Sequence, residues 1–393
     1  MKSFAMLKKI TLRNFKSFRD STFELGPLTL MVGANASGKG NFVDALRFLQ
    51  GCARGLKLNE IFSGKWEGGQ QVWLPIRGGE QEVFNLFENT KSFEVELQCE
   101  FAEVRSTSMV IYRIGVEHTN EILSIHNERM WVEDEEYIHP TLKGIDVIDS
   151  SILLSPLILA AFSSNIPSTV QHWAPLIRKW LSDFHYLELR SHLMRNYVSK
   201  NRPEIGIHGE NLSAVLFRLA SNPEQRRTVL DWVQELCAQE ISDLHFYGTD
   251  IGDEILLAIK EPKGTIISAR SMSDGTLRFL AIIVAMLTAK DGTTFIIEEI
   301  DNDLHPSRLH LLVSFLEQVT ASRKLQVIAS THSPYFLDHL SEASLKNVLV
   351  FHRDQQSAET NVTKLIDIPG FSEARKNMPL DLMHASSWME QNL

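Results

Sequence analysis

The chain has 393 residues, a formal net charge of −10 and 44% hydrophobic residues. This length allows two domains, or one domain with a large insertion, and the apolar content is ordinary for a globular protein. The acidic balance excludes a protein that binds nucleic acid through its overall charge, although a local basic face stays open. Cys52, Cys99 and Cys237 follow neither a metal-binding nor a disulfide pattern. With no signal-peptide pattern at the N-terminus and no apolar run long enough for a bilayer, the sequence predicts a cytoplasmic protein without a membrane partner.

Alternating polar and apolar residues predict strands at the start of the chain, over residues 7–15 and 21–25. A continuous apolar run then predicts a buried strand over residues 28–32. Further along, strict alternation predicts a strand over residues 93–101, and we expect residues 108–116 to pair with it.

A glycine-rich turn, Gly33-Ala-Asn-Ala-Ser-Gly-Lys-Gly40, follows the buried strand and precedes a helix expected from about Lys39. Gly33 and Gly38 let the backbone curl so that successive N–H groups point at one anion, and the start of the helix adds its positive end. Lys39 supplies a charge for the β- and γ-phosphates. A loop without a ligand is the alternative, but the flanking strand and helix are the context that a phosphate loop needs. The predicted nucleotide-binding residues here are Gly33, Asn35, Ala36, Ser37, Gly38, Lys39, Gly40 and Asn41.

Gly40 departs from the phosphate-loop pattern, because a Ser or Thr is expected at this position. The hydroxyl of that Ser or Thr normally ligates Mg²⁺. Without it, the metal has to find water or another side chain, or nucleotide binding is weaker. We therefore expect phosphate capture to persist and hydrolysis to be slow.

Between residues 120 and 250 the pattern changes to amphipathic helices, over residues 172–184, 211–219 and 223–241. Asn222 is a plausible cap of the last of these, with Pro223 at the first helical position. No heptad pattern is sustained, so we expect no long coiled coil.

In the C-terminal third, short buried strands over residues 294–297 and 325–330 alternate with helices over residues 275–290 and 309–320. This alternation predicts a parallel sheet with its chemistry at the carboxyl ends of the strands. Edge strands are expected over residues 348–352 and 362–366, followed by a helical or loose segment over residues 371–393.

Polar side chains follow both of these buried strands. Glu298 and Glu299 follow the first, where Glu298 could hold Mg²⁺ and Glu299 could orient and deprotonate an attacking water. His332 follows the second, and its imidazole could hydrogen-bond a γ-phosphate or that water. Taken singly, a solvated acidic pair and a structural histidine are the plainer interpretations.

The segment Ser271-Met-Ser-Asp-Gly-Thr276 precedes a strongly apolar helix. Ser273 or Asp274 could simply be the N-cap of that helix. The alternative is a second anion site, in which hydroxyls, the Gly275 amide and the positive end of the helix face a phosphate.

The order and spacing of these motifs resemble the ABC-type ATPase head of the SMC and RecF group. The closest likeness is to stand-alone AAA-type ATPases similar to the ATPase part of OLD-family nucleases, many of which occur in bacterial antiphage and abortive-infection operons. The resemblance implies an α/β fold: an ABC-type P-loop ATPase head with a mostly parallel central sheet, an antiparallel β lobe and a helical insertion. It divides the chain into residues 1–105 as the N-terminal lobe, 106–265 as the largely helical insertion and 266–393 as the C-terminal lobe.

The resemblance also assigns roles to individual residues. Asn14 and Lys16 occupy the segment that borders the nucleotide in such heads. Residues 271–276 resemble the signature motif, whose Ser273 and Gly275 would act on the nucleotide of a partner subunit. The remaining assignments are Gly33–Gly40 as Walker A, Glu298 and Glu299 as the Walker B pair, Ile300–Leu304 as a divergent D-loop, His332 as the switch histidine, and Gln70 or Gln71 as the Q-loop glutamine.

A signature motif that acts on a partner implies a homodimer, or a higher homo-oligomer, closed around ATP and Mg²⁺. The first hypothesis is an ATPase that gates a separately encoded effector, a nuclease or toxin, in antiphage defence. A RecF-like DNA-binding repair ATPase is the second, and Arg195, Lys200 and Arg202 would then contact the phosphate backbone. A non-hydrolysing ATP-dependent scaffold is the third. The sequence leaves the effector and its trigger open.

Overall fold

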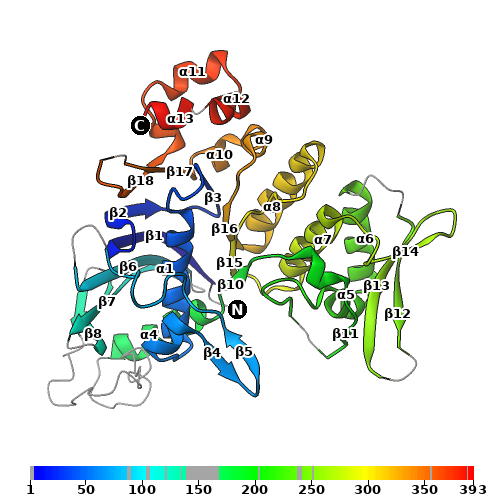
Figure 1. Cartoon of the computed structure of the whole chain (residues 1–393), viewed down its shortest axis with the longest axis horizontal. Helices are drawn as coiled ribbons and strands as arrows, with labels where there is room; N and C mark the ends of the chain where they lie inside the picture. Colours follow the sequence, from blue (N-terminus) through cyan, green and yellow to red (C-terminus); the bar gives the residue numbers. More distant parts are fainter. Residues whose placement is uncertain are drawn as a thin grey trace.

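The structure is a computed structural model that describes residues 4–85, 90–102, 107–119, 122–133, 135–138, 168–201, 204–236, 241–249, 252–354, 356–386 and 388–393. In Figure 1, a parallel sheet stands near the middle of the molecule, an antiparallel sheet lies on one side of it, and helices with a small sheet lie on the other. None of the described helices combines the length and the apolarity needed to cross a bilayer.

An antiparallel sheet of six strands forms the N-terminal lobe. Its strands are β1 (Phe4–Phe15), β2 (Phe18–Glu24), β6 (Ser92–Ala102), β7 (Thr107–Thr119), β8 (Ile122–Val132) and β9 (Glu135–Ile138), in the order β2-β1-β6-β7-β8-β9. Side chains of β6 alternate between buried and half-buried, because only one face of the sheet packs on the core. The predicted pairing of residues 93–101 with 108–116 is confirmed. The sheet continues through β8, so the boundary placed at residue 105 falls within the β6–β7 hairpin.

The central sheet carries the segments that the sequence assigns to nucleotide binding. Its strands are β3 (Leu28–Val32), β10 (His185–Leu187), β15 (Thr294–Ile297), β16 (Gln326–Ser330), β17 (Val348–Arg353) and β18 (Thr360–Lys364), in the order β10-β15-β16-β3-β17-β18. Every pair in this order is parallel except β17–β18, which confirms the predicted mostly parallel sheet. All residues of β3, β15 and β16 are buried, because both faces of the sheet are covered.

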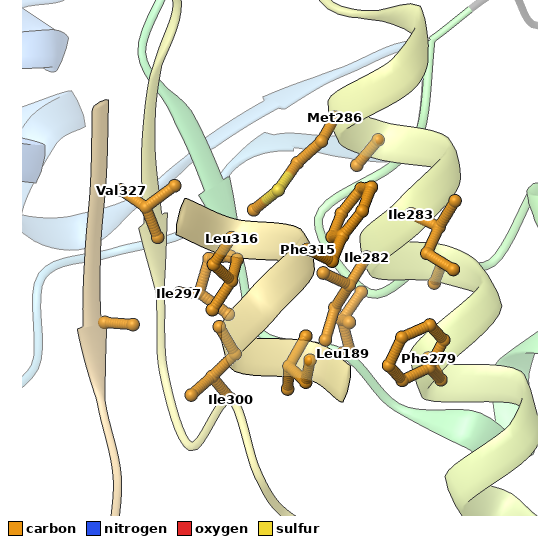
Figure 2. Close-up of a cluster of buried hydrophobic side chains, with 14 of the residues drawn as sticks. Leu189, Phe279, Ile282, Ile283, Met286, Ile297, Ile300, Phe315, Leu316 and Val327 are labelled. Atoms are coloured by element: carbon orange, nitrogen blue, oxygen red, sulfur yellow. The ribbon is translucent and has the colours of Figure 1, made fainter. Parts of the chain in front are cut away.

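Helices cover the two faces of this sheet and give it two hydrophobic cores. Helices α1 (Lys39–Ala53) and α4 (Ser168–Ser182) lie on the side of the antiparallel sheet, and α7 (Asp274–Thr288) and α8 (Leu309–Arg323) lie on the other side. Leu30 and Val32 of β3 belong to the core formed with α7 and α8, whereas Met31 belongs to the core formed with α1. Figure 2 shows side chains of α7 and α8 packed together beside Ile297 and Val327 of the sheet.

The remaining elements surround these layers. Asn222 caps α6, because its Oδ1 accepts the N–H groups of Glu224 and Gln225, as predicted. The elements are α2 (Leu58–Ser63), β4 (Lys65–Glu67), β5 (Gln70–Trp73), η1 (Ser191–Arg195), β11 (Val198–Ser199), α5 (Leu212–Ala220), α6 (Pro223–Leu236), β12 (Asp243–Gly248), β13 (Glu254–Lys260), β14 (Ile266–Ser268), η2 (Pro306–Arg308), α9 (Pro334–Asp338), α10 (Glu342–Leu345), η3 (Leu365–Asp367), α11 (Phe371–Asn377), α12 (Leu380–Ala385) and α13 (Trp388–Gln391).

One buried side chain, Gln326 at the start of β16, joins the two large sheets. Its Oε1 accepts the N–H of Leu7 in β1 at 2.9 Å, and its Nε2 donates to the carbonyl of Leu7 at 2.7 Å. Nε2 also donates to the carbonyl of Gly26 at 3.1 Å. The register of β1 shifts between Leu7 and Lys9, and Gln326 therefore occupies backbone groups beside this irregularity.

Candidate nucleotide-binding site

The phosphate loop connects β3 to α1, as the sequence predicts. Gly33 has φ of 141° and Gly38 has φ of 107°, which side chains other than glycine rarely adopt. A Cβ atom on Gly33 would lie 2.2 Å from the carbonyl oxygen of Phe351, so the neighbouring strand also excludes a larger residue there. Lys39 is buried, and its Nζ donates to the carbonyls of Gly33 at 2.7 Å and Ala34 at 2.8 Å. The loop and its lysine therefore have the geometry of a phosphate cradle.

Neighbouring segments hold the loop in place. Asn41 Nδ2 donates to Ser17 Oγ at 2.7 Å. Thr360 Oγ1 lies 2.7 Å from the same Ser17 Oγ and 3.0 Å from the carbonyl oxygen of Ser37, within hydrogen-bond distance of both. The edge strand β18 and the β1–β2 turn thus both fix the loop, which is a positioning role that the sequence did not indicate for Thr360.

The other predicted loop residues lie around this cradle. Asn35 and Ala36 are exposed, and Ala36 has φ of 61°. Asn14 near the end of β1 and Lys16 in the β1–β2 turn have φ of 52° and 51°. The Lys16 ammonium donates to Asp44 Oδ2 at 2.6 Å, and burial lowers the pKa of Lys16 although Asp44 opposes this effect. Lys16 is thus paired with Asp44 of α1.

The carboxyl ends of β15, β16 and β3 meet at one edge of the sheet, where Ile297, Ala329 and Leu30 stand in register. Glu298, Glu299 and His332 leave the strands at this edge and are thereby brought together with the phosphate loop. Burial lowers the pKa of His332, and the nearby Lys39 lowers it further while Glu299 opposes both.

Glu299 adopts a left-handed conformation with φ of 50°. Its N–H donates to Ser330 Oγ at 2.9 Å, and its Oε2 accepts from Asn302 Nδ2 at 3.3 Å. Backbone strain of this kind is concentrated at functional sites, because surrounding contacts have to hold it. The surrounding contacts thus hold the backbone of Glu299, and Asn302 contacts its carboxylate.

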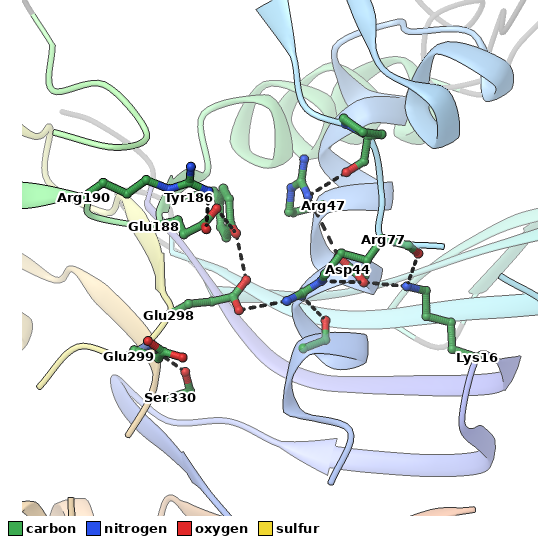
Figure 3. A network of polar contacts seen from close by, with 12 residues as sticks. Lys16, Asp44, Arg47, Arg77, Tyr186, Glu188, Arg190, Glu298, Glu299 and Ser330 are labelled. Atoms are coloured by element: carbon green, nitrogen blue, oxygen red, sulfur yellow. Dashed lines mark hydrogen bonds and ion pairs between the residues drawn. The ribbon is translucent and has the colours of Figure 1, made fainter. Parts of the chain in front are cut away.

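Glu298 is already bonded through both carboxylate oxygens (Figure 3). Oε1 accepts from Tyr186 Oη at 2.8 Å, and Oε2 accepts from Arg77 Nη1 at 3.0 Å. Burial raises the pKa of Tyr186, and Glu298 raises it further, so the phenol stays a hydrogen-bond donor. Burial lowers the pKa of Arg77, but Asp44 and Glu298 outweigh this effect and hold the pKa above its usual value.

Sequence reasoning missed three residues of this network: Arg77, Asp44 and Tyr186. Arg77 lies in a turn that follows the β4–β5 hairpin. The available signals were an aspartate, Asp44, between the apolar residues Val43 and Ala45 of the helix after the loop, and a glycine in place of the expected hydroxyl. Gln70 and Gln71, the Q-loop candidates, are exposed on β5 of this hairpin.

The signature-like segment lies at the start of α7. Ser273 is the N-cap, since its Oγ accepts the N–H of Thr276 at 3.1 Å. A Cβ on Gly275 would lie 2.3 Å from the carbonyl oxygen of Asp303, so this segment packs closely on the D-loop-like residues. Arg195 Nη2 donates to Asp274 Oδ1 at 2.6 Å and further orients the helix start. The contacts described for Ser273 and Gly275 are thus with α7 and the D-loop segment.

Comparison with known proteins adds independent support. The family model described as "AAA domain, putative AbiEii toxin, Type IV TA system" matches residues 159–338, and the one described as "AAA ATPase domain" matches residues 6–150. The chromosome partition protein Smc of Desulfitobacterium hafniense is 39% identical over 117 residues, which are 28% of this chain and 9% of that protein. Smc of Rhodopirellula baltica is 36% identical over 117 residues, with the same coverage. The match thus spans less than a tenth of these relatives.

A solved SMC head has a similar fold. The SmcHead bound to the C-winged helix domain of ScpA covers 92% of this chain and 98% of its own, with a TM-score of 0.51 and 14% identity. The SMC head domain of Thermotoga maritima covers 91% and 98%, with a TM-score of 0.44 and 15% identity. The described residues contain no long coiled coil, consistent with the expected fold. The two matched ATPase domains, the Smc relatives and this head-like fold support an AAA ATPase of the ABC- and SMC-like type.

Proposed function

We propose that this protein binds and slowly hydrolyses ATP, closes as a homodimer or higher homo-oligomer around the nucleotide, and gates a separately encoded effector. The observation that carries this proposal is the meeting of Lys39, Glu299 and His332 at one edge of the parallel sheet. A phosphate cradle beside a carboxylate provides the phosphate-binding and water-positioning groups that phosphoryl transfer to water uses, and the imidazole adds a hydrogen-bonding group beside them.

Each residue has a distinct part in this chemistry. Lys39 and the amides of the phosphate loop bind the β- and γ-phosphates. Glu299 orients the attacking water and accepts its proton. His332, whose pKa is lowered by burial and by Lys39, is neutral near pH 7 and can donate or accept a hydrogen bond at the γ-phosphate.

Mg²⁺ is the cofactor that the family implies, with Glu298 as its predicted ligand. The residues do not fit the ion in this conformation, because Tyr186 and Arg77 take both oxygens of Glu298 and position 40 carries no hydroxyl. Lys39, Glu299 and His332 therefore carry the proposed chemistry.

Dimerisation would complete the site from a second copy. Ser273 is exposed at the start of α7, where the helix presents its positive end to solvent. We propose that Ser273 and Gly275 of one subunit contact the phosphate held by Lys39 of the other, in a two-fold symmetric arrangement.

The effector and the defence role rest on the comparisons. The description of one matching family names the AbiEii toxin and a toxin–antitoxin system. A solved SMC head is bound to a domain of ScpA, which supports partner docking on a head of this fold. We propose that the effector is a nuclease or toxin and that the protein acts in the cytoplasm in antiphage defence.

Two substitutions test the nucleotide and dimer steps separately. We expect Lys39→Ala to abolish binding of a fluorescent ATP analogue, because the loop loses its only lysine. We expect Ser273→Arg to preserve ATP binding by the monomer and to abolish the increase in mass on ATP addition, measured by light scattering. Ser322→Arg is the matched control, since Ser322 is exposed near the end of α8, just before β16 begins at the opposite end of the sheet.

Unchanged ATP affinity in Lys39→Ala would show that the loop is not the nucleotide site. A normal mass increase in Ser273→Arg would show that the signature-like segment takes no part in dimerisation.

A non-hydrolysing scaffold is the second candidate, and Gly40 with its neighbour Arg77 favours it. Steady-state phosphate release by the wild type and by Glu299→Gln separates the two. If both release phosphate at the same background rate, the scaffold is correct.

A further inference from the structure

A guanidinium group occupies the place of the missing hydroxyl in the phosphate loop. A Cβ atom added to Gly40 would lie 2.8 Å from Nη1 and 2.9 Å from Cζ of Arg77. The same guanidinium donates from Nη2 to the carbonyl of Gly40 at 2.6 Å. The space in which a Ser or Thr side chain would project from position 40 is thus filled by Arg77.

Arg77 also holds the carboxylate that follows β15. Its Nη1 donates to Glu298 Oε2 at 3.0 Å, and its Nε lies 3.2 Å from Asp44 Oδ2. In P-loop ATPases, the residue after the lysine and the Walker B carboxylate are the two protein groups that hold Mg²⁺. In this chain Arg77 contacts both of these positions, the carbonyl of Gly40 and the carboxylate of Glu298. Figure 3 shows Arg77 between Glu298 and Asp44.

A network of hydrogen bonds and ion pairs on the buried side of Arg77 holds it in place. Asp44 is fully buried, and Lys16 donates both to Asp44 and to the carbonyl of Arg77, each at 2.6 Å. Arg47 donates to the carbonyl of Leu74 at 2.5 Å and so fixes the backbone that leads to Arg77. Such preorganisation reduces the entropy that Arg77 has to lose when it acts on a ligand.

The charge and exposure of Arg77 suit a phosphate. Guanidinium groups stay protonated and bind phosphate oxygens through a planar fork of donors. Half of the Arg77 side chain is exposed (50%), although Asp44 behind it is fully buried. Arg77 thus places one positive charge, paired with Asp44 and Glu298, where a divalent cation usually lies.

We propose that Arg77 replaces the divalent cation at this site, so that a nucleoside triphosphate binds to the phosphate loop without Mg²⁺. This inference rests on the proposed nucleotide site at Lys39. It assigns Arg77 as a resident cation that links Gly40, Glu298 and the phosphates. This role of Arg77 also explains the glycine at position 40, because any larger residue there would displace the guanidinium.

The experiment measures the affinity of a fluorescent ATP analogue with EDTA and with MgCl₂. We expect equal affinity in both buffers for the wild type. For Arg77→Gln we expect an affinity in EDTA lower by about tenfold, the usual size of a lost charge-assisted hydrogen bond. Gly40→Ser/Arg77→Ala restores the hydroxyl and the space, and we expect its binding to depend on Mg²⁺.

The control is Arg226→Gln, which also removes an arginine paired with an aspartate, Asp243, at 2.7 Å. Arg226 lies on α6, far from α1 in Figure 1, so equal affinity in both buffers is expected. Thermal melting of each variant shows whether it folds, and Arg77→Lys keeps the charge without the fork if Arg77→Gln is unstable.

The possible failures are distinguishable. Absence of binding by the wild type in both buffers would overturn the nucleotide site itself. Binding of the wild type only with MgCl₂ would overturn the role of Arg77 and leave the nucleotide site intact. Equal affinity in EDTA for the wild type and for folded Arg77→Gln would also overturn that role.

Discussion

Single buried polar residues connect the layers of this protein. Gln326 satisfies the N–H and the carbonyl of Leu7 and the carbonyl of Gly26, all at positions closed to solvent. A buried backbone group that loses its partner is costly, whereas a satisfied one contributes little. Gln326 therefore stabilises the fold mainly because it avoids the free-energy cost of unpaired backbone groups where the two large sheets meet.

We expect Gln326→Leu to lower the free energy of unfolding by about 3 kcal/mol, because the Leu7 amide would be buried without this partner. Urea denaturation followed by circular dichroism measures the change. Gln318→Leu is the control, since Gln318 is exposed on α8 and such changes usually stay within about 0.5 kcal/mol. Equal losses in the two variants would contradict the role given to Gln326.

At the scale of residues, the sequence identified the phosphate loop because its glycines, lysine and flanking elements form one short local pattern. Glu298, Glu299 and His332 were predicted from their positions after buried strands. Arg77 was not, since it reaches Glu298 through the fold over 221 positions of sequence. Its segment also has neither helical nor strand periodicity, so nothing local indicated its direction.

At the scale of elements, α7 links the signature-like segment to the Walker B region. Ser273 caps the helix, and Arg278 in its second turn donates to the carbonyls of Leu189 at 2.5 Å and Glu299 at 2.8 Å. Burial lowers the pKa of Arg278, while Asp303 and Glu299 oppose the effect. A displacement of the start of α7 would therefore move Arg278 and, through its hydrogen bond, the backbone of Glu299.

We expect Ser273→Ala to lower the free energy of unfolding by about 1 kcal/mol, because the helix loses its N-cap. If Ser273 also contacts nucleotide in a partner, ATP-dependent dimerisation should weaken as well. Ser341→Ala is the matched control: Ser341 caps α10 by accepting the N–H of Ser344 at 3.3 Å.

Light scattering with ATP, combined with thermal melting, separates the two effects. Both variants should lose stability, and only Ser273→Ala should lose dimerisation. If the two variants dimerise equally well, Ser273 is a cap and nothing more.

Most elements were predicted in type and place, because amphipathic alternation and apolar runs are local signals. The middle of the chain was less predictable. Residues 106–265 were expected to be largely helical, but β7 and β8 extend the antiparallel sheet to residue 132. Alternation in β8 is weak in the sequence, and its pairing with β7 is set by tertiary packing rather than by propensity. Residues 139–167 lie outside the described part of the chain.

At the scale of the molecule, the charge distribution bears on the DNA-binding alternative. The basic segment between residues 190 and 202 is largely paired with carboxylates. Arg190 contacts Glu188 at 2.8 Å, and Lys200 contacts Asp253 at 3.2 Å. Arg202 lies outside the described residues. With a net charge of −10, little positive surface from this segment is left for a phosphate backbone.

We therefore expect Arg190→Ala/Lys200→Ala to leave the affinity for duplex DNA unchanged at every salt concentration. Fluorescence anisotropy of a labelled duplex, titrated at several ionic strengths, measures this. A salt dependence in the wild type that becomes shallower in the double variant would instead favour the DNA-binding repair ATPase.

The strand order of the central sheet also constrains how the protein is made. β3, which leads into the phosphate loop, pairs with β16 and β17 and with no other described strand. Both of these strands lie in the last third of the given sequence, far from β3. During synthesis, β3 can therefore pair with them only after residues 326–353 have been made. We therefore expect a fragment that ends before β16 to leave both edges of β3 unpaired and the phosphate loop without its flanking strands.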